Sequence, residues 1–171
     1  MKEIKVQKLS WEERYKRMMQ LLYASVFCAD EVIEENLSNE QSRALRKKYH
    51  ADLAYKVGKT LVQKYNLEPT VEGALKLYTL YDCEIYGYGA DEYVTAELEN
   101  PNQGIFTISA CRGWEIQKRE GKEELMKKMD CGLETHAEHE ALVKALNPEL
   151  KVKMTKAYPW GDKCCQFVIE K

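Results

Sequence analysis

The spacing of apolar residues changes along this chain of 171 residues from a helical period to a strand period. Up to about residue 80, apolar side chains recur every three or four positions, which is typical of helices with one buried stripe. From residue 93 they alternate with polar side chains over short segments, which is typical of half-buried strands. The pattern predicts an α+β fold, with N-terminal helices packed on a small antiparallel sheet and further helices inserted between its strands.

Two capping boxes mark the starts of two long helices. Ser-Trp-Glu-Glu at residues 10–13 begins a helix that we predict to run to about residue 34. Ser-Asn-Glu-Gln at residues 38–41 begins a second helix that runs to about residue 64. The buried stripe of the second helix is predicted at steps of four, at Leu45, Tyr49, Leu53, Val57 and Leu61.

Other residues of the helical part carry weaker signals. Gly58 costs the second helix roughly 1 kcal/mol relative to alanine and indicates a close crossing with another helix. His50 lies among charged residues and is predicted to be a surface histidine. Pro69 and Thr70 open a shorter third helix that continues through Tyr78. The many tyrosines of this part fit either the lining of a cavity or the face of a homodimer.

The sheet part is predicted to begin with an irregular strand over residues 83–88. Alternating strands over residues 93–98 and 105–111 are joined by Asn-Pro-Asn-Gln-Gly at 100–104, a sequence typical of turns. They should therefore form an antiparallel hairpin. The second of these strands is predicted to end at Cys111, before Gly113.

Helices and two more strands complete the sheet part. A helical stretch begins near Trp114 and is interrupted at Gly121, and a further helix covers residues 134–146. A strand begins near Val152, and residues 158–162 turn the chain. One face of the last strand is formed by Cys165, Phe167 and Ile169.

Length, composition and charge narrow the class of protein to which this chain can belong. The length and the 44% hydrophobic content predict a single domain over residues 1–171, with a helical part over 1–80 and a sheet part over 81–171. A net charge of −2 with mixed signs argues against a nucleic-acid partner. No apolar run approaches the ~18 residues of a membrane-spanning helix, and the N-terminus has no apolar signal core. Six cysteines in such a chain indicate reduced thiols and a cytoplasmic location.

Five residues of the sheet part could bind a soft metal ion or carry out thiol chemistry: Cys111, Cys131, His136, His139 and Cys165. His136 and His139 are three residues apart and so share one face of a helix. Cys111 and Cys165 are predicted at strand ends, and Cys131 at or before the start of the histidine helix. Thiolates and imidazoles from separate elements are ligands that zinc prefers, and an iron–sulfur cluster or haem is an alternative use.

Three uses of these residues remain open. In a metal site with one open position, bound water becomes a nucleophile near neutral pH. Without a metal, a cysteine beside a histidine base is itself a nucleophile, and Glu138, Glu140 and Asp162 are carboxylates that could orient the histidine or move the proton. A structural role is the third use, because buried cysteine often acts as a small hydrophobe and a His-x-x-His pair on a charged helix is commonly solvated.

Three segments of the sheet part carry a family resemblance. They are Phe-Thr-Ile-Ser-Ala-Cys at 106–111, a ligand-type pair three residues apart before Leu-Asn-Pro at 146–148, and Gly-Asp-Lys-Cys-Cys-Gln-Phe at 161–167. Over about residues 80–170 the chain resembles the L-2-amino-thiazoline-4-carboxylic acid hydrolase-like family of small bacterial proteins. By position, Cys111 and Cys165 match the family's first and last cysteines. His136 and His139 stand where the family usually has a cysteine and an acidic residue.

The resemblance implies hydrolytic opening of a thiazoline ring, at a carbon–nitrogen bond of a cyclic amidine. The first hypothesis is therefore a hydrolase of a small molecule, with a catalytic set of Cys111, His136, His139 and Cys165 and with Cys131 in reserve. The second is a non-catalytic binding module in which the same residues hold zinc, an iron–sulfur cluster or haem. The third is a dimeric scaffold built on the tyrosine-rich helices.

Overall fold

The computed structural model describes residues 10–85 and 93–171. Contacts divide the chain into two compact units, Met1–Asn36 and Leu37–Lys171. The described part of the first unit is helix α1 (Trp11–Asn36), and it begins with the predicted capping box. Ser10 N–H donates to Glu13 Oε2 over 2.8 Å, and Glu13 N–H donates to Ser10 Oγ over 3.2 Å. The organisation as one domain remains a prediction.

The second unit begins with helices α2 (Asn39–Tyr65) and α3 (Val71–Ile85). The second capping box is confirmed, because Ser38 and Gln41 exchange both capping hydrogen bonds at the start of α2. The irregular strand predicted over residues 83–88 is wrong at 83–85, where α3 continues. Burial at the helical spacing continues from Tyr78 to Tyr81 and Asp82, which explains why the helix extends beyond the predicted end. Residues 86–88 lie outside the described part of the chain.

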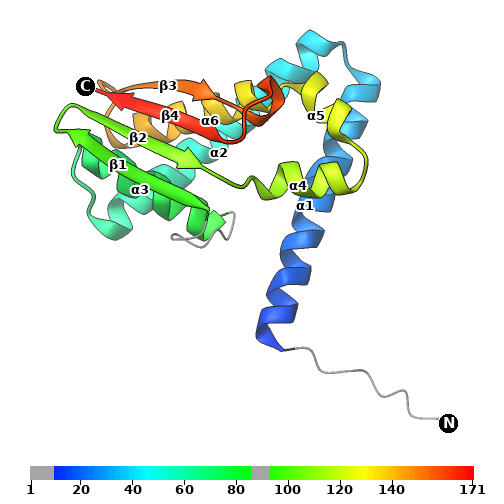
Figure 1. The fold of residues 1–171 in the computed structure, drawn as a ribbon, viewed down its shortest axis with the longest axis horizontal. Coiled ribbons are helices and arrows are strands. Elements are labelled where there is room, and N and C mark those ends of the chain that lie inside the picture. Colours follow the sequence, from blue (N-terminus) through cyan, green and yellow to red (C-terminus); the bar gives the residue numbers. More distant parts are fainter. Residues whose placement is uncertain (1–9, 86–92) are drawn as a thin grey trace. The chain divides into compact units, whose positions relative to one another are not determined.

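Four antiparallel strands form one sheet in the order β1-β2-β4-β3. Their bounds are β1 (Val94–Asn100), β2 (Gln103–Ile108), β3 (Lys151–Lys156) and β4 (Cys165–Glu170). The predicted hairpin is confirmed, since β1 pairs with β2 across the turn at residues 101–102. Helices α2 and α3, together with α6 (Cys131–Leu146), lie behind the sheet in Figure 1. The fold is therefore α+β, as the sequence predicts.

The segment between the two strand pairs departs from the prediction at its start. Strand β2 ends at Ile108, so the predicted continuation to Cys111 is wrong. The backbone N–H and the hydroxyl of Ser109 both donate to the carbonyl oxygen of Tyr93. Cys111 is the N-cap of helix α4 (Arg112–Arg119). The predicted break near Gly121 is confirmed by the start of helix α5 (Glu123–Met129).

Helix α2 turns a different face to the core than the sequence predicts. The predicted stripe residues Leu45, Tyr49 and Leu53 are exposed, whereas Leu61 at the end of the stripe is buried as predicted. The buried positions of this helix are Ser42, Arg46, Ala54, Gly58 and Leu61. The prediction counted only apolar side chains, whereas three of these five buried residues are polar or lack a side chain. The close crossing at Gly58 is confirmed, because an added Cβ would lie 3.0 Å from the Ala145 Cβ and from Leu142 Cδ1 of α6.

The inner face of the sheet forms the core together with α2, α3 and α6. Alternate residues of β2 and β4 are buried, and Phe106, Phe167 and Ile169 are fully enclosed. The face predicted for the last strand is therefore confirmed. Strand β1 differs, since only Val94 of its seven residues is buried, and Ala96 and Leu98 on the same face of the strand are exposed.

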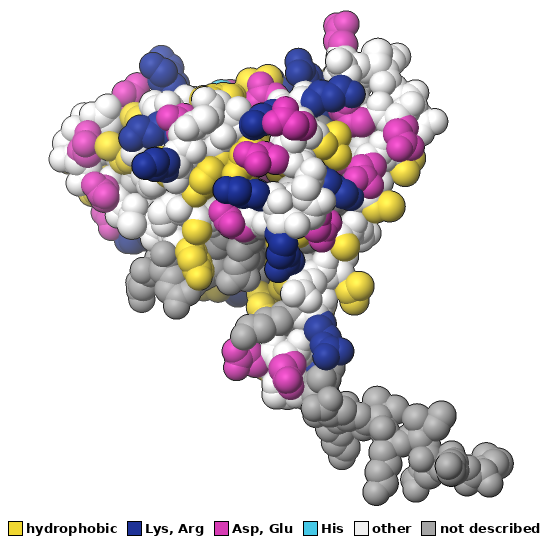
Figure 2. Space-filling view, turned by 45° about the vertical axis from the view of Figure 1, so that its right-hand side comes forward, with side chains coloured by type: hydrophobic (Ala, Val, Ile, Leu, Met, Phe, Trp, Pro, Cys, Tyr) yellow, Lys and Arg dark blue, Asp and Glu magenta, His cyan; other side chains and the backbone are white. Residues whose placement is uncertain are grey.

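Charge is distributed evenly on the part of the surface drawn in Figure 2, where acidic and basic side chains are interspersed. The two edge strands of the sheet, β1 and β3, are exceptions, because each carries charges of one sign along its sequence. Strand β1 carries Glu97 and Glu99, whereas β3 carries Lys151, Lys153 and Lys156. Among the described residues, no helix is both long enough and apolar enough to cross a membrane.

Candidate functional site

Cys111 occupies the N-cap position of α4, where its backbone is extended (φ −83°, ψ 112°). Its sulfur accepts the backbone N–H of Trp114 at an N···S distance of 3.4 Å. Unpaired amide groups give a helix N-terminus a partial positive charge, which favours the thiolate form of a cysteine placed there. The side chain is half-buried, so a small molecule can approach it. Cys111 thus combines access with a favourable place for negative charge.

Cys165 lies beside the end of β2, because its register partner across β2 and β4 is Ile108. Tyr158, in the 3-10 helix η1 (Tyr158–Trp160), lies between the two cysteines, because its backbone contacts the Cys165 thiol and its hydroxyl contacts the Cys111 backbone. The Tyr158 hydroxyl donates to the Ser109 carbonyl oxygen over 2.8 Å, and its ring stacks on Trp114 at a centroid distance of 5.9 Å. Burial, with a smaller contribution from Cys111, raises the pKa of Cys165 to about 12. Burial, and then the charge of Cys111, raise the pKa of Tyr158 to about 12 as well.

Cys131 is the first residue of α6 and follows Asp130, which has a left-handed backbone (φ 52°). The N-terminus of α6 packs closely on η1, since a Cβ on Gly132 would lie 3.1 Å from the Ala157 Cβ and from two ring carbons of Trp160. The Trp160 indole N–H donates to Asp130 Oδ1 over 3.0 Å. Burial raises the pKa of Cys131 well above its ordinary value, and the charges of Cys111 and Cys165 add to this effect.

We call Cys111, Cys131 and Cys165 the thiol cluster. Each member comes from a different element, and the charge of Cys111 contributes to the raised pKa of both other thiols, which places the three near one another. The raised pKa values of Cys131 and Cys165 mean that these two thiols stay protonated at neutral pH. The structure therefore brings together three of the five residues that the sequence predicts for the site.

The two predicted site histidines make their contacts elsewhere. His136 Nε2 lies 3.2 Å from the Val152 carbonyl oxygen of β3. His139 Nδ1 lies 2.8 Å from the Thr135 carbonyl oxygen, and its ring stacks on Phe167 at 4.1 Å in the core. Burial lowers the pKa of His139, so the ring is neutral at physiological pH. The rings do not converge on one point, although three-residue spacing on a helix allows it.

Within residues 10–85 and 93–171, no three His, Cys, Asp or Glu side chains are arranged to hold a metal ion. One ring nitrogen of His136 and one of His139 each lie within hydrogen-bond distance of a backbone carbonyl oxygen. The second ring nitrogen of His139 is enclosed in the core. These positions do not fit the donor set of a Cys and His zinc site. Zinc, an iron–sulfur cluster and haem therefore remain predictions from the sequence.

Comparison with known proteins supports the resemblance seen in the sequence. The family model of L-2-amino-thiazoline-4-carboxylic acid hydrolase matches residues 14–169. The chain belongs to this family. The match extends beyond residues 80–170, where the sequence motifs lie, into the helical part. It spans all three members of the thiol cluster and both histidines.

Other comparisons add little to the family assignment. No curated protein is a significant match to the chain. A crystal structure of trafficking protein particle complex subunit 3 from Naegleria fowleri, covalently bound to palmitic acid, is similar at a TM-score of 0.46 and 10% identity. The likeness covers 91% of this chain and 95% of that chain. A similarity this distant carries no argument about this family member.

Sequence reasoning missed a second group of polar side chains, which lies between α2 and α6. Arg46 is 2% exposed and forms an ion pair with Glu134, and its Nη1 donates to Ser42 Oγ over 2.8 Å. His50 is half-buried, so the predicted surface position is wrong. Its Nε2 lies 3.8 Å from Glu134 Oε2, and its Nδ1 lies 3.9 Å from Glu138 Oε1.

We call Arg46, His50, Glu134 and Glu138 the buried charge cluster. The sequence contained a signal for it, because Arg46 and His50 are four apart on one helix and the two carboxylates are four apart on another. Burial works against the charge of Glu138, but the neighbouring His50 ring and Tyr81 outweigh burial and lower its pKa. The Tyr81 hydroxyl donates to Glu138 Oε1 over 2.5 Å. The carboxylate therefore stays ionised inside the protein.

Asp82 of α3 is buried beside this cluster and behaves in the opposite way. Its Oδ2 has no hydrogen-bond partner within the described part of the chain. Burial, and then the charge of Glu138, raise its pKa well above the ordinary value of 3.8. Such a group contributes most to stability below its unfolded pKa, and the contribution is lost as pH rises towards the folded pKa.

We predict that Asp82→Asn stabilises the protein at neutral pH by about 1–3 kcal/mol, because the variant no longer holds a carboxyl in its neutral form against its preference for ionisation. The difference between variant and wild type should shrink towards pH 4, and urea unfolding at several pH values measures it. The titration of Glu138 is common to both proteins and cancels. Glu149→Gln, which changes an exposed carboxyl, is the control. A constant difference across this pH range would contradict the prediction.

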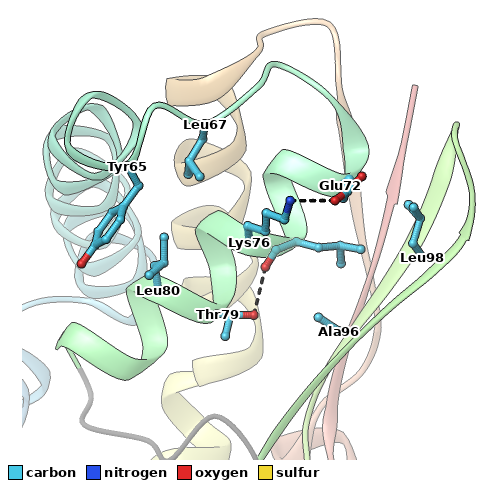
Figure 3. A pocket seen from close by; sticks show the side chains of 9 residues that line it. Tyr65, Leu67, Glu72, Lys76, Thr79, Leu80, Ala96 and Leu98 are labelled. Carbon is cyan, nitrogen blue, oxygen red and sulfur yellow. Dashed lines mark hydrogen bonds and ion pairs between the residues drawn. The ribbon is translucent and has the colours of Figure 1, made fainter.

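An open groove of about 450 Å³ lies between α3 and β1. Figure 3 shows its lining, which is formed by Tyr65, Leu67, Glu72, Leu75, Lys76, Thr79, Leu80, Ala96 and Leu98. Glu72 and Lys76 form an ion pair of 2.7 Å on its wall. The groove explains why Ala96 and Leu98 are exposed despite facing the helices. None of the five predicted site residues lines it.

Proposed function

We propose that this protein hydrolyses a small cyclic amidine of the thiazoline type, as the family name suggests. In the net reaction, one water molecule adds its oxygen to the ring C=N carbon. A bond from that carbon to a ring heteroatom breaks, and the departing atom takes a proton. No oxidant or reductant is required. The observation that carries the proposal is the Cys111 thiol at the N-terminus of α4, next to a second, protonated thiol on β4.

In this proposal Cys111 is the nucleophile. The Trp114 N–H and the helix N-terminus stabilise the thiolate, which adds to the ring carbon. The protonated thiol of Cys165 supplies a hydrogen to the departing ring atom. Water then attacks the same carbon, one of its protons returns to Cys165, and the Cys111 thiolate is released. A neutral donor beside an anionic nucleophile is the division of roles that this chemistry needs.

Tyr158 and the two predicted site histidines suit supporting roles in this arrangement. Tyr158 stays protonated and bonds to the Ser109 carbonyl oxygen, which holds the segment before Cys111 in place. His136 and His139 remain part of the predicted catalytic set, and their contacts suit residues that fix α6 against β3 and Phe167. A cytoplasmic location and a homodimer remain predictions as well.

The experiment that tests the function is an assay of the reduced full-length protein with 2-amino-thiazoline-4-carboxylate. We expect a product heavier than the substrate by one water molecule, at a rate that a metal chelator leaves unchanged. Elemental analysis of the same sample tests the alternative of a metal-binding module. No ring opening of this or any related cyclic amidine would overturn the proposal. Stoichiometric zinc, or a visible absorbance from iron, would favour the alternative instead.

A further inference from the structure

Cys111 and Cys165 lie at the same end of the same pair of strands. The register of β2 and β4 places Cys165 beside Ile108, and only a two-residue bend separates Ile108 from Cys111. The Tyr158 hydroxyl holds that bend through the Ser109 carbonyl oxygen at 2.8 Å. The two cysteines therefore lie at the same end of neighbouring strands, although they are 54 positions apart in sequence.

The two thiols differ in ways that suit successive steps of an oxidation. Cys111 is half-buried and accepts a helix N-terminal amide, so it has the access and the charge stabilisation of a peroxide-reactive thiol. Cys165 is 7% exposed, and burial raises its pKa. A buried thiol with a raised pKa, such as Cys165, reacts slowly with a dissolved oxidant. It is nevertheless well placed to react with an oxidised sulfur beside it.

We propose that a hydroperoxide oxidises Cys111 and that Cys165 then captures it in an intrachain disulfide. In the first step the Cys111 thiol and hydrogen peroxide give a sulfenic acid and one water molecule. In the second step the Cys165 thiol displaces hydroxide from that sulfur, and the lost proton completes a second water molecule. Two thiols are oxidised to one disulfide, and one peroxide is reduced to two waters. A dithiol reductant reverses the bond.

The disulfide closes the thiol cluster to substrate. That consequence depends on the proposed function, because it assumes that Cys111 is the nucleophile. The disulfide itself does not depend on it. Mass and thiol measurements therefore test the oxidation even when the ring-opening assay shows no activity, and the two failures are distinguishable.

The test treats the reduced full-length protein with a small excess of hydrogen peroxide and then maps its peptides without reduction. We expect a mass loss of two hydrogen atoms, a thiol count lower by two, and a peptide pair joined through Cys111 and Cys165. Dithiothreitol should restore the original mass. Cys111→Ser should abolish the bond, and serine is well suited to the N-cap position, so this variant keeps the helix start.

Two further variants make the test specific. Cys165→Ser should leave the Cys111 sulfenic acid uncaptured, so that dimedone labels Cys111 in this variant more strongly than in wild type. Cys131→Ser is the matched control from the same cluster and should still form the Cys111–Cys165 bond. A bond between Cys111 and Cys131, a bond between other cysteines, or six unchanged thiols in wild type would each overturn the proposal.

Discussion

Replacing Cys111 with serine is expected to reduce kcat/KM for the ring-opening reaction by a factor on the order of 10³ or more, because the proposed nucleophile is lost. The hydroxyl of serine ionises far less readily than a thiol at this position. Serine is also a favourable N-cap residue, so the start of α4 should persist. The far-ultraviolet circular dichroism and the thermal unfolding midpoint should therefore remain close to those of wild type.

Two other cysteines show whether this effect is specific. Cys165→Ser should lower kcat more than it raises KM, because the proposed role of this thiol lies in the proton transfer and not in binding. Cys164→Ser is the matched control, since Cys164 is the half-buried neighbour of Cys165 and has no proposed role. Full activity in both Cys111→Ser and Cys165→Ser would refute the proposed chemistry. Equal losses in all three variants would indicate a structural effect instead.

Removing the Arg46 side chain is expected to cost about 3–5 kcal/mol of unfolding free energy, the range seen when one partner of a buried ion pair is deleted. Arg46→Met keeps much of the volume but removes the charge that faces Glu134. The carboxylates of Glu134 and Glu138 would then be buried with only His50 to balance them. Urea unfolding measures the loss as a lower midpoint with an unchanged slope.

A second pair of variants separates burial from charge. Lys144→Met breaks an exposed pair with Glu140 and should change stability little. The double variant Arg46→Met with Glu134→Met should recover much of the loss, because a well-packed apolar pair can replace a buried ion pair. If Arg46→Met costs no more than Lys144→Met, the buried charge cluster is not important for stability.

The elements that local signals define were predictable from the sequence. Both capping boxes, the β1–β2 hairpin and the break at Gly121 depend on residues close together in the chain, and all of them are confirmed. The close crossing at Gly58 was predictable for a similar reason, because a glycine inside a long helix needs a packing explanation. These signals fix where elements begin, end and approach each other.

The orientation of α2 was not predictable in this way. Its leucines and Tyr49 suggested one buried face, but the fold buries Arg46 and half-buries His50, because both find carboxylates on α6. Apolar spacing cannot reveal a charged side chain that is buried through a partner 88 residues away. The paired four-residue spacings of the two helices were the available signal.

The candidate site was predictable in part. The three cysteines meet, but alternation alone extended β2 to Cys111, where the chain in fact bends and caps a helix. The bend depends on hydrogen bonds from Ser109 to Tyr93 and from Tyr158 to Ser109, which no local pattern contains. The spacing of His136 and His139 predicted one helix face for both but not their partners. His136 contacts a carbonyl oxygen of β3, and His139 stacks in the aromatic core.

The composition of the two terminal strands has a consequence for solubility. An unpaired strand edge can pair with the same edge of a second molecule and join the two sheets into one. Two copies that met through β1 would bring Glu97 and Glu99 of each copy together, and two that met through β3 would crowd their lysines. Like charges therefore oppose both symmetrical ways of aggregation. Because salt screens such repulsion, this protection should weaken as ionic strength rises.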